Sequence, residues 1–73
     1  MTYCIGILLT TGLPVTITTD SKETHDSLLQ ELSSKDSVVE IEQNGTLLSV
    51  RTTSIVKIVT KTNASPEDIV KML

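Results

Sequence analysis

The sequence predicts a small α+β domain, in which an antiparallel sheet or a partly closed barrel carries one amphipathic helix and a short C-terminal helix. Three observations lead to this class. The segment 37–51 has the pattern of two strands joined by a tight turn. A capped segment with leucines at helical spacing precedes it, and a run of β-branched residues follows it. The expected order of elements within one domain, 1–73, is β-β-α-β-β-β followed by the short helix.

The hairpin at 37–51 is the most clearly specified element. Its Asn44-Gly45 dipeptide tolerates the two positive φ angles of a type I′ turn, so we expect strands at about 37–43 and 46–52. A two-residue loop fixes the register of the facing pairs, which are Gln43 with Thr46, Ile41 with Leu48 and Val39 with Val50. The apolar pairs share one face, and the opposite face carries Glu40, Glu42, Ser49 and Arg51.

Two strands are expected before the helix, at about 3–10 and 14–19. The first is apolar on both sides, which indicates a strand covered on both faces or one at an oligomer interface. The loop between the two strands leaves two registers open. A three-residue loop pairs Ile7 with Ile17, whereas a two-residue loop pairs Ile7 with Thr16. Matching of the apolar faces favours the three-residue loop.

Two helices are expected, at about 21–34 and 66–72. Asp20 is the expected N-cap of the first helix, and Glu23 completes a capping box. The apolar stripe of this helix is narrow, so the helix should lie on the apolar face of the hairpin. The stripe consists of Leu28, Leu29 and Leu32. The second helix begins with an N-cap and a proline at Ser65-Pro66, and it is too short to persist unless it docks on its own sheet or on a neighbouring subunit.

A polar interruption at 52–54 should bend the chain before a last strand at about 55–61. Consecutive hairpins then predict an antiparallel meander, in which the helix between the second and third strands is the only long connection. Five short strands of this kind can stay open as a sheet or curl into a small barrel.

The small apolar content of the chain predicts self-association. The 73 residues are 38% hydrophobic, and Tyr3 is the only aromatic residue, so isoleucine, valine and leucine must build the core. Chains of this size without a metal or a disulfide commonly gain burial from a second copy, and we expect a homo-oligomer. The candidate interface residues are Leu8, Ile69, Val70 and Leu73.

The charge disfavours nucleic acid as a partner. A net charge of −3 and a pI near 4.8 differ from the basic face that nucleic-acid binding uses. The candidates for contact with a phosphate or an acidic partner are Arg51, Lys57 and Lys61.

Cys4 is the only cysteine, which fits a reducing compartment, and no apolar run reaches the ~20 residues of a membrane span. We therefore expect a cytoplasmic protein without a membrane partner.

Residue patterns for catalysis or metal binding are weak. His25 is the only histidine, and no spacing places a nucleophile beside it. One histidine, one cysteine and scattered acids do not supply a metal-ligand set. Glu40 and Glu42 share a strand face, where paired carboxylates usually keep an edge soluble. We expect no enzymatic activity, no catalytic or metal-binding residues and no cofactor.

The segment VVEIEQNGTLLSVRTTSIVKIV resembles the second half of many small bacterial and prophage α+β proteins of unknown function. It is also similar to the last strands of Sm-like barrels. The second resemblance implies a ring-forming barrel that binds RNA. Sm-like proteins place their helix before the first strand, whereas this chain places it between the second and third strands, and no functional residue is transferred.

Three functional hypotheses follow. The leading one is a small non-enzymatic interaction module that binds an unidentified protein, as a homo-oligomer. The first alternative is a nucleic-acid-binding small barrel that uses Arg51, Lys57 and Lys61. The second alternative is a protein that binds or sequesters a small ligand in a pocket between subunits.

Overall fold

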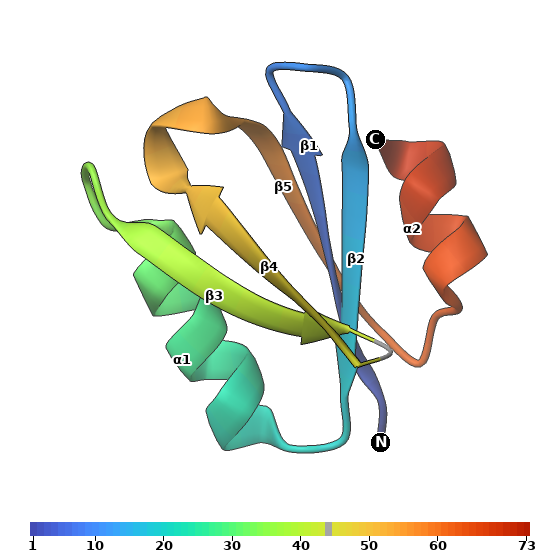
Figure 1. Cartoon of the computed structure of the whole chain (residues 1–73). Coiled ribbons are helices and arrows are strands. Elements are labelled where there is room, and N and C mark those ends of the chain that lie inside the picture. Colours follow the sequence, from blue (N-terminus) through green and yellow to red (C-terminus); the bar gives the residue numbers. More distant parts are fainter. Residues whose placement is uncertain (44) are drawn as a thin grey trace.

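The computed structural model describes residues 1–43 and 45–73, which form five strands in two antiparallel sheets and two α-helices (Figure 1). The α+β class is therefore confirmed. The strands are divided between a three-stranded and a two-stranded sheet, so the open sheet is the alternative that forms, and not a closed barrel. The two-stranded sheet crosses in front of the three-stranded one, and the two helices lie on different sides of the larger sheet (Figure 1).

The larger sheet has the order β2-β1-β5, formed by β1 (Tyr3–Leu9), β2 (Pro14–Thr19) and β5 (Ile55–Thr62). This order contradicts the predicted meander, because β5 pairs with β1 and not with its neighbour in the sequence. The reason is a 3-10 turn at Thr52–Ser54, which carries the chain from one sheet to the other. The turn is held by the carbonyl of Ser54, which accepts a hydrogen bond from the N–H of Thr10 at 2.8 Å.

The β1–β2 hairpin has a register that neither predicted loop gives. Ile7 pairs with Val15, and both predicted partners of Ile7 are wrong. The loop consists of residues 10–12, with Gly12 last at a φ of 86° and its N–H bonded to the carbonyl of Leu9 at 2.9 Å. Glycine is the residue that the last position of a three-residue hairpin loop favours, because that position is left-handed. Odd-numbered residues of β1 still pair with odd-numbered residues of β2, so the apolar side chains of both strands face the core.

The smaller sheet consists of β3 (Val38–Gln43) and β4 (Thr46–Arg51). Its pairing of Ile41 with Leu48 and of Val39 with Val50 confirms the predicted register. The predicted turn type at Asn44-Gly45 lies outside the described residues. Thr52 closes the open end of the ladder, since its N–H donates to the Ser37 carbonyl at 2.8 Å and its hydroxyl accepts from the Ser37 N–H at 2.9 Å.

Helix α1 (Lys22–Leu32) and the β3–β4 hairpin together cover one face of the larger sheet. The helix leucines and the inner face of the hairpin belong to one core, and both lie against odd-numbered residues of β1 and β2. The helix therefore lies mainly on the larger sheet and not on the hairpin as predicted. The buried members of this core are Ile5, Ile7, Val15, Ile17, Leu32, Val39, Ile41 and Val50. All of them are aliphatic, as the composition requires.

The N-terminus of α1 lies one residue later than predicted. Ser21 is the N-cap, because its hydroxyl accepts from the N–H of Thr24 at 3.3 Å, and the predicted capping box of Asp20 and Glu23 does not form. The hydroxyl of Thr19 accepts from the N–H of Ser21 at 3.2 Å and helps to fix this start. Asp20 and Ser21 are both residue types that cap helices, and the hydroxyl of Thr19 at the end of β2 favours Ser21.

We expect Ser21→Ala to lower the free energy of unfolding by about 1 kcal/mol, because it leaves the N–H of Thr24 without its cap. Asp20→Ala is the matched control and should change stability by less than about 0.5 kcal/mol, since Asp20 is exposed. Urea unfolding followed by circular dichroism measures both. A larger loss in the Asp20 variant would contradict the assignment of the cap.

Helix α2 (Pro66–Met72) covers the other face of the larger sheet. It begins as predicted, with Pro66 in the first turn and the hydroxyl of Ser65 accepting from the N–H of Asp68 at 3.3 Å. Ile69 is fully buried and lies over Gly6, so the helix docks on its own sheet. The thiol of Cys4 donates a hydrogen bond to the carbonyl of Ala64, just before the helix, at 2.8 Å.

Candidate functional site

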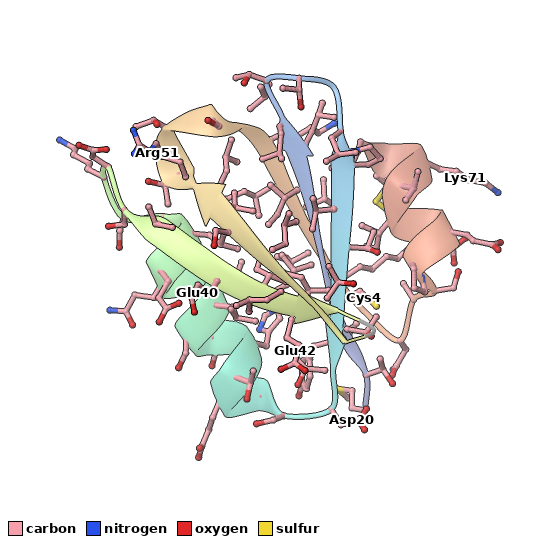
Figure 2. All side chains as sticks on the ribbon, viewed as in Figure 1. Cys4, Asp20, Glu40, Glu42, Arg51 and Lys71 are labelled. Carbon is pink, nitrogen blue, oxygen red and sulfur yellow. The ribbon has the colours of Figure 1, made fainter. Side chains whose placement is uncertain are left out.

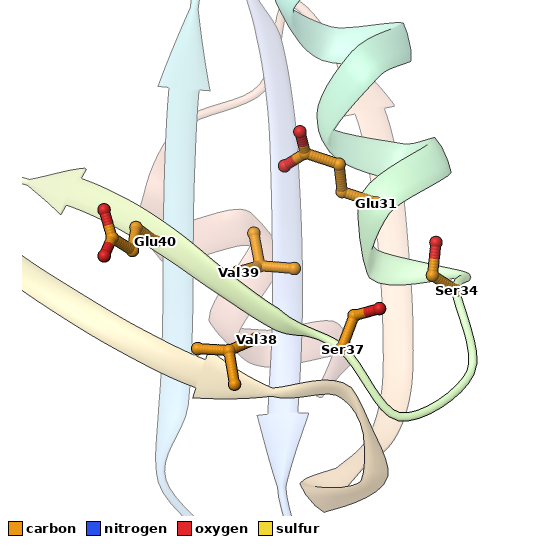
Figure 3. A pocket seen from close by; sticks show the side chains of 6 residues that line it. All are labelled: Glu31, Ser34, Ser37, Val38, Val39 and Glu40. Atoms are coloured by element: carbon orange, nitrogen blue, oxygen red, sulfur yellow. The ribbon is translucent and has the colours of Figure 1, made fainter.

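A hollow of about 530 Å³ lies between α1 and β3 (Figure 3). Its walls come from the C-terminal half of α1, from the connection to β3 and from the first half of β3. The residues that line it are Glu31, Ser34, Ser37, Val38, Val39 and Glu40. We refer to this hollow as the α1–β3 groove.

The connection between α1 and β3 sets the width of the α1–β3 groove. After the helix ends, Asp36 adopts a left-handed backbone with a φ of 47°, which turns the chain back along the helix. The hydroxyl of Ser34 donates to the Gln30 carbonyl at 3.2 Å, and the N–H of Ser34 donates to the Glu31 carbonyl at 3.1 Å. These bonds extend the helical path past Leu32 and keep the start of β3 beside the helix.

The outer edge of β3 faces the groove with its backbone groups. Because the N–H of Thr52 bonds to the Ser37 carbonyl, Ser37 belongs to the hydrogen-bonded pairs of the ladder. Such pairs alternate in an antiparallel ladder, so the N–H and C=O groups of Val38, Glu40 and Glu42 point away from β4. Within the described part of the chain, β4 is the only strand that pairs with β3. This edge is therefore open to an added strand.

The side chains around the groove are acidic. Glu31 extends from α1 toward β3, and Glu40 projects from the strand on the other side of Val39 (Figure 3). Both glutamates are exposed, and no lysine or arginine is among the described residues that line the groove. Val38 adds an apolar side chain that is 58% exposed, while Val39 is buried. The groove thus offers backbone hydrogen-bonding groups, two negative charges and one exposed apolar contact.

The basic residues singled out in the sequence do not surround this groove. Arg51 ends β4, whereas Lys57 and Lys61 lie on β5, so Arg51 belongs to a different sheet from the two lysines. The 3-10 turn interrupts the extended chain that would align them along one edge. The Nζ of Lys57 donates to the carbonyl of Met72 at 2.8 Å, which ties this lysine to the last turn of α2.

The residues predicted for an oligomer interface lie together around α2. Ile69 is buried against its own sheet and has no surface left for a partner. Val70 is 44% exposed, whereas Leu8 and Leu73 are half-buried. The predicted interface therefore depends on Val70 and on the rims of Leu8 and Leu73, and it stays a prediction.

Sequence reasoning missed the α1–β3 groove. It assigned no role to Glu31 and interpreted Glu40 as a solubilising residue of the strand. Nothing in their spacing shows that they approach the same hollow, because the conformation of residues 33–37 decides that. One sequence feature could have indicated the groove: a short connection joins the amphipathic helix to a strand whose alternate residues are acidic and apolar.

The described residues contain no group of three or more histidines, cysteines, aspartates or glutamates that could hold a metal ion. No helix within residues 1–43 and 45–73 has the length and hydropathy to span a bilayer.

The fold and the groove define a small α+β domain of two open sheets with an acidic, unpaired strand edge. Comparison of the chain with protein-family models, with curated protein sequences and with solved structures gives no match.

Proposed function

We propose that this chain is a small, non-enzymatic interaction module that binds an extended, basic segment of another protein as an added strand along β3. The open edge of β3 beside the acidic α1–β3 groove is the observation that supports this proposal. Strand addition of this kind takes its affinity from main-chain hydrogen bonds and its specificity from alternate side chains. We also place the module in the cytoplasm, where the single thiol of Cys4 stays reduced.

The groove defines the partner's chemistry at alternate positions. A residue opposite Glu40 shares the outer face of the sheet with it, so lysine or arginine is favoured there. The next residue of the added strand points to the opposite face, toward α1, where Glu31 provides a second negative charge. Each main-chain hydrogen bond contributes a net ~0.5–1.5 kcal/mol, and each exposed ion pair ~0.2–1 kcal/mol. Such a partner binds with the modest affinity of a transient complex.

A peptide titration tests the proposal. The probe is a ten-residue peptide in which pairs of lysines alternate with pairs of valines, so that both faces of the added strand carry lysine. The control peptide has glutamate in place of lysine. We expect the lysine peptide to shift the amide resonances of Val38, Glu40 and Glu42 and to protect them from hydrogen exchange, because these N–H groups point to the open edge. The glutamate peptide should not bind. Shifts spread evenly over the surface would contradict binding at β3.

Charge reversal separates the groove from the general acidity of the chain. The double variant Glu31→Lys, Glu40→Lys should weaken the lysine peptide about tenfold, since two ion pairs become repulsions. The matched control Glu67→Lys, Asp68→Lys changes the net charge equally on α2, which lies on the other face of the larger sheet. Equal weakening by the control would mean non-specific attraction.

Self-association remains the second candidate, because large apolar side chains are exposed on both sides of the molecule. Val38 and Leu47 lie on the outer face of the hairpin with exposures of 58% and 62%, and Val70 lies on α2. Light scattering on the chain without peptide, in the same buffer, reports whether a second copy is already bound. The nucleic-acid alternative has less support, since Arg51 and Lys57 belong to different sheets.

A further inference from the structure

The α1–β3 groove is closed at one end. Helix α1 and β3 diverge from residues 33–37, the short connection that joins them, and Ser34 and Ser37 of this connection line the groove (Figure 3). The N–H and the hydroxyl of Ser34 both donate to carbonyls of the last helical turn, which keeps the connection against the helix. A strand that is added along β3 therefore has room to continue past Glu42, but the connection blocks any residues that precede the level of Val38.

The closed end of the groove is negatively polarised. The carbonyl groups of its last turn give the C-terminus of a helix a partial negative charge, which favours cations. The last turn of α1 has no basic residue to offset this charge, and Glu31 adds a full negative charge to the groove. Lys35 and Asp36 are neighbours in the connection, so their charges offset each other. The closed end therefore favours the α-amino group at the N-terminus of an added strand over the carboxylate at a C-terminus.

The direction of β3 then determines the direction of the added strand. Because β3 runs from the closed end, at Val38, toward the open end, a segment whose N-terminus lies at the closed end is parallel to β3. If its first residue is level with Val38, its third is level with Glu40 and its fifth with Glu42, and each shares a sheet face with its neighbour. Glu40 and Glu42 both point away from the core (Figure 2). The second residue points to the other face, toward α1 and Glu31.

We propose, on the basis of the strand addition at β3 proposed above, that the α1–β3 groove captures the free N-terminus of another protein. The first residues of that protein form a strand parallel to β3, and its α-amino group lies beside the last turn of α1. A basic second residue faces Glu31, and a basic third residue lies level with Glu40. A segment from the middle of a chain fits less well, because the connection at 33–37 leaves no path for the residues before it.

Blocking the two ends of one peptide tests the direction of the strand. The probe is Val-Lys-Lys-Val-Val-Lys-Lys-Val, which has the same sequence in both directions. Acetylation of its N-terminus should weaken binding at least fivefold, because it removes the charge and adds a group at the closed end. Amidation of its C-terminus should change the affinity less than twofold, because that end lies past the open end of the groove. Calorimetry measures the affinities, and a larger effect of amidation than of acetylation would overturn the proposal.

The amide resonances of Val38 and Glu40 separate this proposal from strand addition itself. Equal affinities of the free and the acetylated peptide, with shifts at both residues, would overturn N-terminal capture alone. Absence of shifts with every peptide would overturn strand addition as well. The peptide Lys-Val-Val-Lys-Lys-Val-Val-Lys has the same composition, and it should bind about threefold more weakly, because its second and third residues are not basic. Equal affinities of the two sequences would mean that the strand slides past Val38, and would contradict the closed end.

A cation placed at the closed end tests where the amino group lies. Ser34→Lys should reduce the preference for the free over the acetylated peptide to less than twofold, because the new charge repels the amino group. The matched control Ser27→Lys adds the same charge to α1 outside the groove and should keep the preference. Both serines are exposed, so both variants should keep the native circular dichroism spectrum. An undiminished preference in the Ser34 variant, or an equal loss in both variants, would overturn the proposal.

Discussion

Gly6→Ala loosens the contact between α2 and the sheet and lowers the free energy of unfolding by about 1–3 kcal/mol, the usual cost of overpacking a core. A β-carbon on Gly6 would overlap Cγ2 of Ile69, and it would lie 3.3 Å from Cδ1 of Leu73. Ile69 is fully buried and cannot move aside without lifting the helix. The cost is therefore steric, because Gly6 lies inside a regular strand without a positive φ.

A double-mutant cycle identifies the cause of that loss. Ile69→Ala alone should destabilise by about 2–5 kcal/mol, as for other buried isoleucines. In the Ile69→Ala background, however, Gly6→Ala should be neutral or stabilising by up to ~1 kcal/mol, since the obstacle is gone and alanine restricts the unfolded chain more than glycine. Urea denaturation followed by circular dichroism measures all four proteins. Equal costs of Gly6→Ala in both backgrounds would contradict the contact.

Ile7→Ala should remove a large part of the stability of the fold. Ile7 is fully buried at the centre of β1, where β2 and β5 pair on its two sides. The expected loss is about 2–5 kcal/mol. A chain of 73 residues has a total free energy of unfolding of roughly 4–11 kcal/mol. The variant is therefore expected to unfold at a much lower urea concentration than the parent chain.

Val56→Ala is the control for the loss at Ile7. Val56 is an aliphatic residue on β5 with an exposure of 62%, at the point where the β1–β5 ladder shifts register. Its truncation should cost less than about 0.5 kcal/mol, because little apolar area returns to water. A loss as large as that of Ile7→Ala would mean that a partner or a second copy covers Val56 in solution.

The features that the sequence predicted correctly are those that neighbouring residues determine. The β3–β4 register follows from a two-residue loop and from alternation, and the start of α2 follows from Ser65-Pro66. The β1–β2 register could also have been predicted, because Gly12 marks the last position of the loop. The N-cap prediction at Asp20 was wrong, because the hydrogen bond from Ser21 to Thr19 at the end of β2 favours Ser21.

The pairing of β5 with β1 could not be predicted by local rules. A meander costs less loop-closure entropy, and only the packing of both sheets around one aliphatic core makes the distant pairing favourable. The α1–β3 groove depends instead on a short connection. Glu31 and Glu40 approach the same hollow because the left-handed Asp36 turns the chain back, and the sequence gives no sign of that backbone conformation.

The position of β1 between its neighbour in the sequence and the last strand has a consequence for synthesis. As the chain leaves the ribosome, β1 can pair early with β2, but its other edge stays open until Ile55–Thr62 has emerged. Cys4, the site of Gly6, and Leu8 remain uncovered even longer, because α2 follows β5. Until β5 and α2 have emerged, the nascent chain therefore presents an apolar strand with one unpaired edge, the kind of surface that chaperones bind.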